Sequence, residues 1–463
     1  MDFINGKLKP IYFKYLAAAF GSALITSIYS IVDMAIVGQY QGPDGTAALA
    51  VVAPIWNIIF SLGLLMGIGG SIIFSTLKGS SDQNTHSQNE YFSTAVIGSL
   101  LLAVIFWIVI IFFDKQLLTF FGAKDNLMPL ALEYLIPIKF VIPCFLFTQM
   151  LAAFLRNDNS PTLATVAVLL GGVFNIFGDY TFVFLFDMGI FGAGLATAIG
   201  SVISCFIMLL HFLSKSNTLY LVKPTHIFLK FKKICVTGFS TFFIDIAMGI
   251  LTILFNRQIM KYLGTNALSI YGIIVNISTF VQCCAYSVGQ ASQPIISMNY
   301  GAKQGDRIKE TLKYALCSVA FFSILWSALS LCIPNIFVTF FMKPTDEILA
   351  MAPAIISIYG LSFILLPFNI FSTYYFQALL KPQISFIISI TRGLIVSGIL
   401  IFLLPLLNVH YIWFTMLFTE IIVAFFSVIS MIYYTKSLPA KTHQSNADKK
   451  VLFSLFSLND TFL

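Results

Sequence analysis

The sequence predicts an all-α polytopic membrane protein with twelve transmembrane helices in two pseudo-symmetric six-helix lobes. Three observations support this prediction. The 463-residue chain is 58% hydrophobic and only 10% charged, with a mean hydropathy of +0.91, whereas soluble domains carry about 25% charged residues. Its apolar runs are long enough to cross a membrane, and its two halves repeat a spaced pattern of residues.

The apolar runs have the length of membrane-spanning helices. About 20 residues, at 1.5 Å per residue, cross a hydrocarbon core of about 30 Å. A transmembrane β-barrel would instead need strands of about 10 residues with alternating polarity, so we exclude it. The expected spans are 11–37, 47–77, 90–113, 129–153, 160–184, 190–213, 234–262, 267–299, 311–334, 348–378, 383–407 and 410–435.

The second half of the chain repeats residues of the first half at a shift of about 219 positions. The matching pairs are Gly45 with Gly264, Asn57 with Asn276, and Gly70 with Gly289. A further set matches at nearly the same shift: Phe121 with Phe341, Asp125 with Asp346, and Pro161 with Pro382. A duplicated, strongly apolar chain is typical of secondary transporters, in which two similar lobes move around a central site.

The boundary between the lobes follows from a change in composition. The longest expected internal connection, about 214–233, contains five lysines. We therefore expect a first six-helix lobe at 1–214, a cytoplasmic inter-lobe linker at 215–233, a second six-helix lobe at 234–435 and a cytoplasmic tail at 436–463. The tail is polar and expected to be disordered, with 451–456 as an alternative interfacial segment.

Lysine and arginine separate by side when the N terminus is placed in the cytoplasm. Nineteen of the 26 basic residues then fall inside, five fall outside, and Lys139 and Arg392 lie within spans. This is the positive-inside bias, and it predicts that both termini are cytoplasmic. The net charge of +7 therefore indicates no nucleic-acid partner. We expect the first helix to be an uncleaved anchor.

The seven cysteines lie in or beside the expected spans, and none forms a CxxC pair. This pattern is typical of small apolar packing residues rather than of a disulfide framework or a zinc site. No Gly-x4-Gly-Lys-Ser/Thr loop is present, so we expect no bound nucleotide. We expect neither a cofactor nor a resident metal.

Polar residues inside the expected spans are the candidates for function, because an ionised side chain in mid-membrane costs about 2.5–3.5 kcal/mol. Asp33 lies in the first span and Asp179 in the fifth. Asn175 precedes Asp179 by four residues, so both lie on one helix face. Thr197, in the sixth span, adds a hydroxyl. These oxygens suit a hard cation or a proton-switched cluster; alternatively, the acids reach headgroup water at the span ends.

Three further charged residues lie within expected spans. Asp245, about ten residues into the seventh span, is a candidate for substrate or coupling-ion binding. Glu420, in the twelfth span, is either a similar candidate or a structural partner of Arg392. Lys139 is either a counter-ion to one of the first-lobe acids or extends its ammonium toward the membrane surface.

The sequence resembles the multidrug and toxic compound extrusion (MATE) transporters, and most closely their bacterial drug-efflux and DNA-damage-inducible branch. The resemblance covers about 10–435 and rests on the order and spacing of six segments: Ile31–Gly38, Leu155–Pro161, Asn175–Asp179, Gly192–Thr197, Gly289–Pro294 and Asn299–Ala302.

This resemblance implies two six-helix bundles around a V-shaped cavity in the bacterial plasma membrane. It implies an antiporter, not an enzyme, that exports organic cations and is driven by inward proton or sodium flow. The coupling-cation cluster would be Asp33, Asn175, Asp179 and Thr197, with a possible sodium ion on the first three. We expect a monomer whose partners are a small organic cation and the lipid bilayer.

Two alternatives belong to other classes of membrane protein. A flippase for lipid-linked or other amphiphilic molecules would share this fold, but Lys139 and Arg392 are few basic residues for a polyanionic cargo. An intramembrane aspartyl protease would also use two buried aspartates. Its Gly-x-Gly-Asp motif would require glycine at position 176, where this chain has Ile176.

Overall fold

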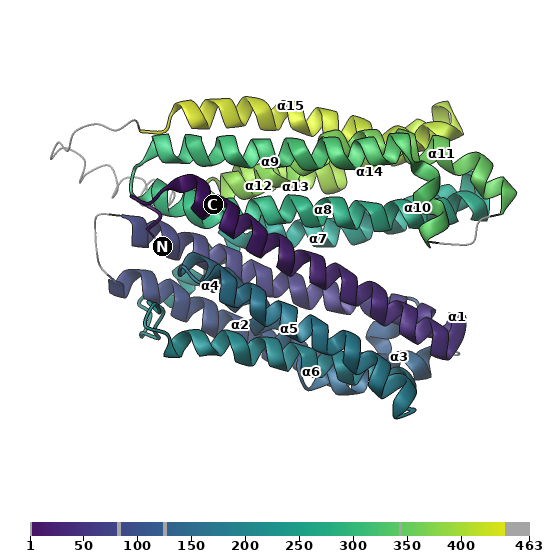
Figure 1. Ribbon diagram of the computed structural model, residues 1–463, viewed down its shortest axis with the longest axis horizontal. Helices are drawn as coiled ribbons and strands as arrows, with labels where there is room; N and C mark the ends of the chain where they lie inside the picture. Colours follow the sequence, from purple (N-terminus) through teal and green to yellow (C-terminus); the bar gives the residue numbers. More distant parts are fainter. Residues whose placement is uncertain (1, 81–84, 124–126, 342–344, 440–463) are drawn as a thin grey trace.

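The computed structural model describes residues 2–80, 85–123, 127–341 and 345–439. Figure 1 shows a molecule built from long helices. Asp125, one member of the repeat, and the expected tail beyond Pro439 lie outside the described residues.

The helices follow the expected apolar spans closely. In the first half of the chain they are α1 (Leu8–Gly79), α2 (Thr85–Phe120), α3 (Met128–Lys139), α4 (Ile142–Asn157), α5 (Pro161–Tyr180), η1 (Thr181–Leu185), α6 (Gly189–Leu209) and η2 (Leu210–Leu213). In the second half they are α7 (Ile227–Tyr262), α8 (Gly264–Gly301), α9 (Gly305–Cys332), α10 (Pro334–Phe341), α11 (Asp346–Gly360), η3 (Leu361–Ile364), α12 (Leu366–Ala378), α13 (Pro382–Ile390), η4 (Thr391–Ile395), α14 (Val396–Leu407), η5 (Val409–Phe414) and α15 (Thr415–Lys436).

The number of spans agrees with the sequence. Within the described residues, 11 helices are long and apolar enough to cross a membrane, and one bent helix pair brings the number to 12. The kinked α1 supplies two of these spans, Leu8–Gly42 and Asp44–Gly79. They are joined at Gly42, whose φ of 68° is a conformation that glycine adopts readily.

The bent pair forms the span that was expected over 129–153. It consists of α3 and α4, with axes bent by 62° at the break. Pro143, in the first turn of α4, has no N–H to donate to the carbonyl four residues earlier, and its ring clashes there. Helix α3 therefore ends at Lys139, and α4 begins with proline in its first turn, where proline is tolerated.

The connection between the two halves is shorter than predicted. Helix α7 begins at Ile227, inside the expected linker of 215–233. The preceding segment is held against the first half of the chain, because the Asn89 side chain donates to the Thr218 carbonyl oxygen and the Tyr220 N–H donates to Asn89. The segment before α7 therefore packs against α2.

The helices form two groups that lie side by side (Figure 1). One group contains α1–α6 and the other contains α7–α15, and the first part of α1 crosses from the second group to the first. The start of α1 packs on α9, where the Tyr12 hydroxyl lies 3.0 Å from Ser318 Oγ. Farther along, Ser22 Oγ lies 3.1 Å from Thr165 Oγ1 of α5. The first helix thus contacts both groups.

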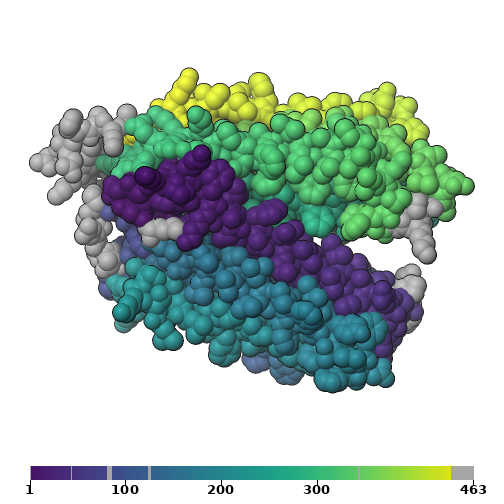
Figure 2. All heavy atoms as spheres, viewed as in Figure 1, coloured from purple at the N-terminus to yellow at the C-terminus, as the bar shows by residue number. Residues whose placement is uncertain are grey.

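The two groups approach most closely near the end of the molecule that carries the N terminus. A Cβ added to Gly79 of α1 would lie 2.0 Å from the Met298 carbonyl oxygen of α8, and one on Gly301 would lie 1.9 Å from the Thr76 carbonyl oxygen. These backbones touch only because both positions are glycine. Figure 2 shows the groups diverging toward the opposite end, with an opening between them.

Candidate functional site

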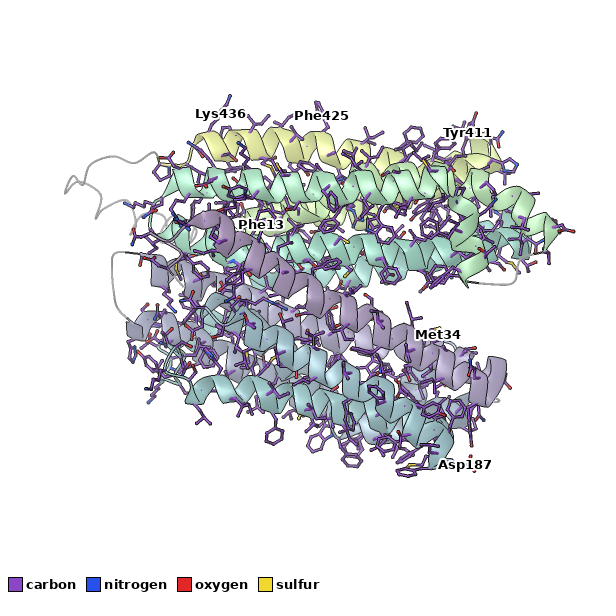
Figure 3. All side chains as sticks on the ribbon, in the orientation of Figure 1. Phe13, Met34, Asp187, Tyr411, Phe425 and Lys436 are labelled. Atoms are coloured by element: carbon purple, nitrogen blue, oxygen red, sulfur yellow. The ribbon has the colours of Figure 1, made fainter. Side chains whose placement is uncertain are left out.

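The first group of helices brings the four predicted residues Asp33, Asn175, Asp179 and Thr197 into one buried cluster. Asp33 comes from α1, Asn175 and Asp179 from α5, and Thr197 from α6. Figure 3 shows Met34 on the side of α1 that faces the second group. Met34 is 45% exposed, whereas Asp33 is only 9% exposed, because consecutive helical residues point about 100° apart.

Hydrogen bonds connect the members of this cluster. Asn175 Nδ2 donates to Thr197 Oγ1 at 3.0 Å and to Asp179 Oδ1 at 3.5 Å. The Tyr134 hydroxyl of α3 donates to Asp33 Oδ2 at 3.0 Å. Tyr134 also interacts with Thr197 and Asp179, so it links Asp33 to the other three residues.

Three oxygens of the cluster are buried without a hydrogen-bond partner. They are Asp33 Oδ1, Asn175 Oδ1 and Asp179 Oδ2. A buried acceptor that lacks a donor costs about 1–3 kcal/mol, and more when it is charged. Three such acceptors in one place fit a bound cation or protonated carboxyl groups, because either supplies the missing positive partner.

The absence of a basic partner separates Asp33 and Asp179 from other buried acids. Within the described residues, neither forms an ion pair with Lys, Arg or His. Three other buried acids are each neutralised at short distance: Asp158 by Lys78 at 2.5 Å, Glu90 by Lys230 at 2.5 Å and Glu420 by Arg392 at 2.8 Å.

Asp245 of α7 lies between the two groups of helices. Its side chain is half-buried. Ser61 Oγ of α1 donates to Asp245 Oδ2 at 3.0 Å, and the Tyr286 hydroxyl of α8 lies 3.4 Å from Asp245 Oδ1. The carboxylate therefore joins a helix of the first group to a helix of the second, and no basic residue of the described chain pairs with it.

Glu420 forms an ion pair with Arg392, which was one of its two alternatives in the sequence analysis. Arg392 Nε lies 2.8 Å from Glu420 Oε1. Asn369 Nδ2 donates to Glu420 Oε2 at 2.6 Å and to the Glu420 backbone oxygen at 2.9 Å. Both charged side chains are buried, so the pair contributes a fixed, neutralised contact among η4, α12 and α15.

Lys139 lies apart from the acidic cluster. Its Nζ lies 2.5 Å from Asp114 Oδ2 of α2, and the two side chains are 18% and 19% exposed. Lys139 is therefore the counter-ion of Asp114 and not of Asp33 or Asp179. Among the described residues, no ammonium group forms an ion pair with Asp33 or Asp179.

A second polar network, which the sequence analysis did not identify, ties helix ends together at the N-terminal end of the molecule. Asp158, directly after α4, accepts from Lys78 at 2.5 Å and contacts His211 Nε2 at 2.8 Å. The Thr218 N–H donates to it at 2.8 Å. Burial raises the pKa of Asp158, but the hydrogen bond with His211 and the ammonium of Lys78 outweigh burial, so the pKa lies below its usual range.

Sequence reasoning also missed the neutral partners of the candidate acids. Tyr134, Ser61, Tyr286 and Asn369 are ordinary residues of apolar helices in the sequence. Each becomes informative only through the acid that it contacts. For Arg392 and Glu420 there was a signal, because two opposite charges in neighbouring apolar spans must neutralise one another.

The fold and the unneutralised intramembrane acids define a class: a two-lobed, all-helical membrane transporter. The MatE family profile matches residues 18–181 and 241–403, which is more than half of the chain. The chain therefore belongs to the MatE family, the multidrug and toxic compound extrusion transporters, as the sequence resemblance predicted.

Curated relatives and solved structures agree with this assignment. The chain is 27% identical over 302 residues to the multidrug export protein MepA of Staphylococcus saprophyticus, covering 64% of this chain and 65% of that protein. It is 25% identical over 402 residues to MepA of Staphylococcus aureus strain MSSA476, covering 86% and 87%.

Two solved structures share the fold at low sequence identity. An outward-facing multidrug resistance MATE transporter is 19% identical, with a TM-score of 0.86 over 94% of this chain and 98% of that one. A MOP superfamily transporter from Pyrococcus furiosus is 18% identical, also with a TM-score of 0.86, over 95% and 98%.

Proposed function

We propose that the chain is a secondary active antiporter that exports organic cations across the bacterial plasma membrane, driven by inward proton or sodium flow. Membership of the MatE family and similarity to proteins named multidrug export proteins support the export of drugs. The coupling step and the choice of substrate rest on the geometry of the buried acids. We propose a monomer as the working unit.

The observation that carries this proposal is the pair of unneutralised acids in the first-group cluster. Two carboxylates buried without a basic partner cannot both remain charged and empty, because burying a bare charge costs far more than burying a paired one. Asp33 and Asp179, with the free oxygen of Asn175, would therefore bind one sodium ion or up to two protons. Thr197 and Tyr134 would orient the acceptors.

Asp245 is the proposed contact for the substrate cation. It is the half-buried acid between the two groups, and it accepts a hydrogen bond from Ser61 of α1. A lipophilic cation beside Asp245 would compete with Ser61 for the carboxylate. Loss of that hydrogen bond would weaken a contact between the two groups, and substrate binding would thereby affect how they are held together.

The proposed orientation of the chain in the membrane rests on the basic residues at the end where the two groups approach each other. Lys78 and Lys230 form ion pairs there, on the side that the positive-inside bias predicts to be cytoplasmic. In this arrangement the opening shown in Figure 2 would face the outside. We propose that the N terminus and the segment before α7 lie in the cytoplasm.

The test is ethidium efflux from energised, pump-deficient bacteria that express the full chain, in sodium-free and in sodium-containing buffer. We expect efflux from cells with the wild-type protein and at least a tenfold loss for Asp179→Asn. A requirement for sodium would identify the ion. Asp187→Asn is the matched control, because Asp187 is an exposed acid outside the cluster with φ 55°, a conformation that asparagine tolerates.

Two results would contradict the proposal. Asp33→Asn and Asp179→Asn proteins that insert normally and still pump at the wild-type rate would remove the coupling role of the cluster. Absence of efflux from a well-expressed wild-type protein would remove drug export and would direct attention to lipid-linked or other amphiphilic cargo.

A further inference from the structure

A groove on the outer surface of the second group lies between α9 and the end of α15. Figure 1 shows these two helices running side by side. Both pack against α12, but they do not pack closely against each other, so a gap is left between them. The cavity volume is about 440 Å³, within the range of about 300–1,000 Å³ that is usual for ligand sites. The proposed export function makes no use of this groove.

Most of the groove is apolar. Its lining residues are Lys309, Leu312, Lys313, Leu316, Cys317, Ala320 and Thr435. The surface on either side is apolar as well, since Phe321 of α9 and Phe425 of α15 are largely exposed. Figure 3 shows Phe425 pointing away from the bundle. Exposed apolar side chains on membrane-spanning helices mark a surface that faces lipid, so the groove opens toward the acyl chains.

Two lysines lie at one end of the groove. Lys309 and Lys313 are four residues apart on α9, so they lie on one helix face, where like charges repel each other. Both side chains are exposed. Lys309 has a loose partner in Asp306 at 3.8 Å, and Lys313 has no ion pair within the described residues. The neighbouring Glu310 accepts a hydrogen bond from Tyr314. An anion between the two ammonium groups would remove their repulsion.

The charged and apolar parts of the groove are arranged like those of a phospholipid. The lysines lie in the first turns of α9, and Ala320 lies about 10 Å beyond Lys313 along the helix axis. At the matching end of α15, Thr435 lines the groove, and the next residue, Lys436, is exposed (Figure 3). Lysines at helix ends place their ammonium groups at the level of the lipid headgroups.

We propose that this groove binds an anionic phospholipid, with its phosphate between Lys309 and Lys313 and an acyl chain along the apolar side chains that follow. Basic residues at the membrane surface attract anionic lipids. A zwitterionic phospholipid carries its own ammonium group, which the two lysines would repel. The acyl chain would fill the gap between α9 and α15, where an empty space would lose dispersion contacts. This inference does not depend on the proposed export function.

Native mass spectrometry of the purified full-length protein measures the binding. The probes are phosphatidylglycerol and phosphatidylcholine with identical acyl chains. We expect the first phosphatidylglycerol to bind at least about fivefold more tightly than the first phosphatidylcholine. The third probe, glycerol phosphate, has the anionic group but no acyl chain, and we expect it not to bind at the same concentrations.

Replacing the two lysines tests the headgroup contact. We expect Lys309→Gln with Lys313→Gln to reduce the preference for phosphatidylglycerol to less than about twofold. Both side chains are exposed, so the fold does not depend on them. The matched control is Lys223→Gln with Lys232→Gln, which removes the same charge from two exposed lysines before and within the start of α7. This control should keep the preference of the wild type.

Filling the groove tests the acyl-chain contact. Ala320 is exposed and lines the groove, so Ala320→Trp can place its ring there without disturbing the helix core. We expect it to weaken binding of phosphatidylglycerol at least about threefold. Ile324→Trp is the control, because Ile324 is a largely exposed residue of the same helix that does not line the groove. Its binding should equal that of the wild type.

Two cysteines of α9 report where the lipid binds. Cys317 lines the groove, Cys332 lies at the other end of the helix, and both are exposed. Their alkylation by N-ethylmaleimide is followed by peptide mass spectrometry. At a phosphatidylglycerol concentration of about ten times Kd, we expect the reaction of Cys317 to slow at least about fivefold relative to Cys332. Phosphatidylcholine at the same concentration should protect Cys317 less.

Several results would overturn the proposal. They are equal binding of the two lipids, a preference that survives the Lys309 and Lys313 replacements, an equal loss in the Lys223 and Lys232 control, or no protection of Cys317. Binding of glycerol phosphate as tight as that of phosphatidylglycerol would show a site for free anions and would also exclude the lipid site. None of these measurements uses a drug or an ion gradient, so failure of the export hypothesis leaves their outcome unchanged.

Discussion

In the first half of the chain, Asp33 and Asp179 lie buried beside amide and hydroxyl groups, whereas in the second half Glu420 lies buried against Arg392. The two halves share a repeated sequence pattern, yet these two buried sites differ in how their negative charge is balanced; Asp245 of the second half, like Asp33 and Asp179, has no basic partner in the described residues. An acid without a basic partner depends on a mobile cation, while an acid with one is already satisfied. We therefore propose that the Asp33–Asp179 cluster is a switchable site and that the Glu420–Arg392 pair is a fixed one.

The largest expected effect comes from breaking the fixed pair. Arg392→Gln alone leaves Glu420 buried without its cation, and we expect a loss of about 3–5 kcal/mol in stability. Arg392→Gln with Glu420→Gln removes both charges and should cost much less. Thermal unfolding of the purified proteins in detergent checks this difference. Equal melting temperatures for the single and the double variant would refute the idea that the pair is electrostatically self-contained.

The opposite effect on stability is expected at Asp33 and Asp179, which lack a basic partner among the described residues. Asp33→Asn with Asp179→Asn removes two unneutralised buried acids, so we expect stability to be unchanged or to rise by about 1–3 kcal/mol, while ethidium efflux is lost. Thermal unfolding and efflux are measured on the same variant. A strong destabilisation would show that these acids are structural, as Glu420 is.

A smaller effect on stability is expected for Asp158, at the end of the molecule where the two groups of helices approach each other. Its pKa is lowered in the folded protein, because the hydrogen bond with His211 and the charge of Lys78 outweigh the effect of burial. A carboxyl group whose pKa is lowered by folding stabilises the folded protein at pH values above its unfolded pKa of about 3.9. This stabilisation is lost as the pH falls through the folded-state pKa.

We therefore expect the melting temperature of the wild type to fall more steeply between about pH 5 and pH 3 than that of Asp158→Asn, by about 1–3 °C. Other acids titrate equally in both proteins, so the difference between the two curves isolates Asp158. Parallel curves would contradict the role given to this network.

The smallest effect on stability is expected from replacing Lys139. Its pair with Asp114 is partly exposed, and such pairs contribute about 1 kcal/mol or less. Lys139→Gln should therefore change stability little and leave ethidium efflux unaltered. A large loss of efflux would instead support a role for Lys139 in coupling, which was one of its alternatives in the sequence analysis.

Predicting spans from the sequence succeeded because membrane helices are set by local apolar length. The spans 383–407 and 410–435 correspond to Pro382–Leu407 and Val409–Lys436 in the structure. The angle of 62° at the break before Pro143 could not be predicted, because a proline bends or ends a helix according to the contacts available on either side. Helix α7 begins at Ile227, before the expected span start at 234, because its first turns contain lysines and so lack the apolar signal of a span.

Part of the candidate site was also predictable. Asn175 and Asp179 are four residues apart on one helix, so their shared face follows from helical periodicity alone. The position of Asp33 beside them does not, because it depends on how α1 crosses α5. The role of Lys139 was open in the sequence for the same reason, since its partner Asp114 lies on a different helix.

By itself, the sequence determined that this chain spans a membrane about twelve times, that its halves are related, and which charged residues lie in apolar helices. Those properties depend on composition, length and periodicity, which are local. Only the tertiary structure decided which buried acids have a basic partner. Neutralisation requires two side chains within about 4 Å, and residues from helices far apart in the chain reach that distance only once the helices have packed.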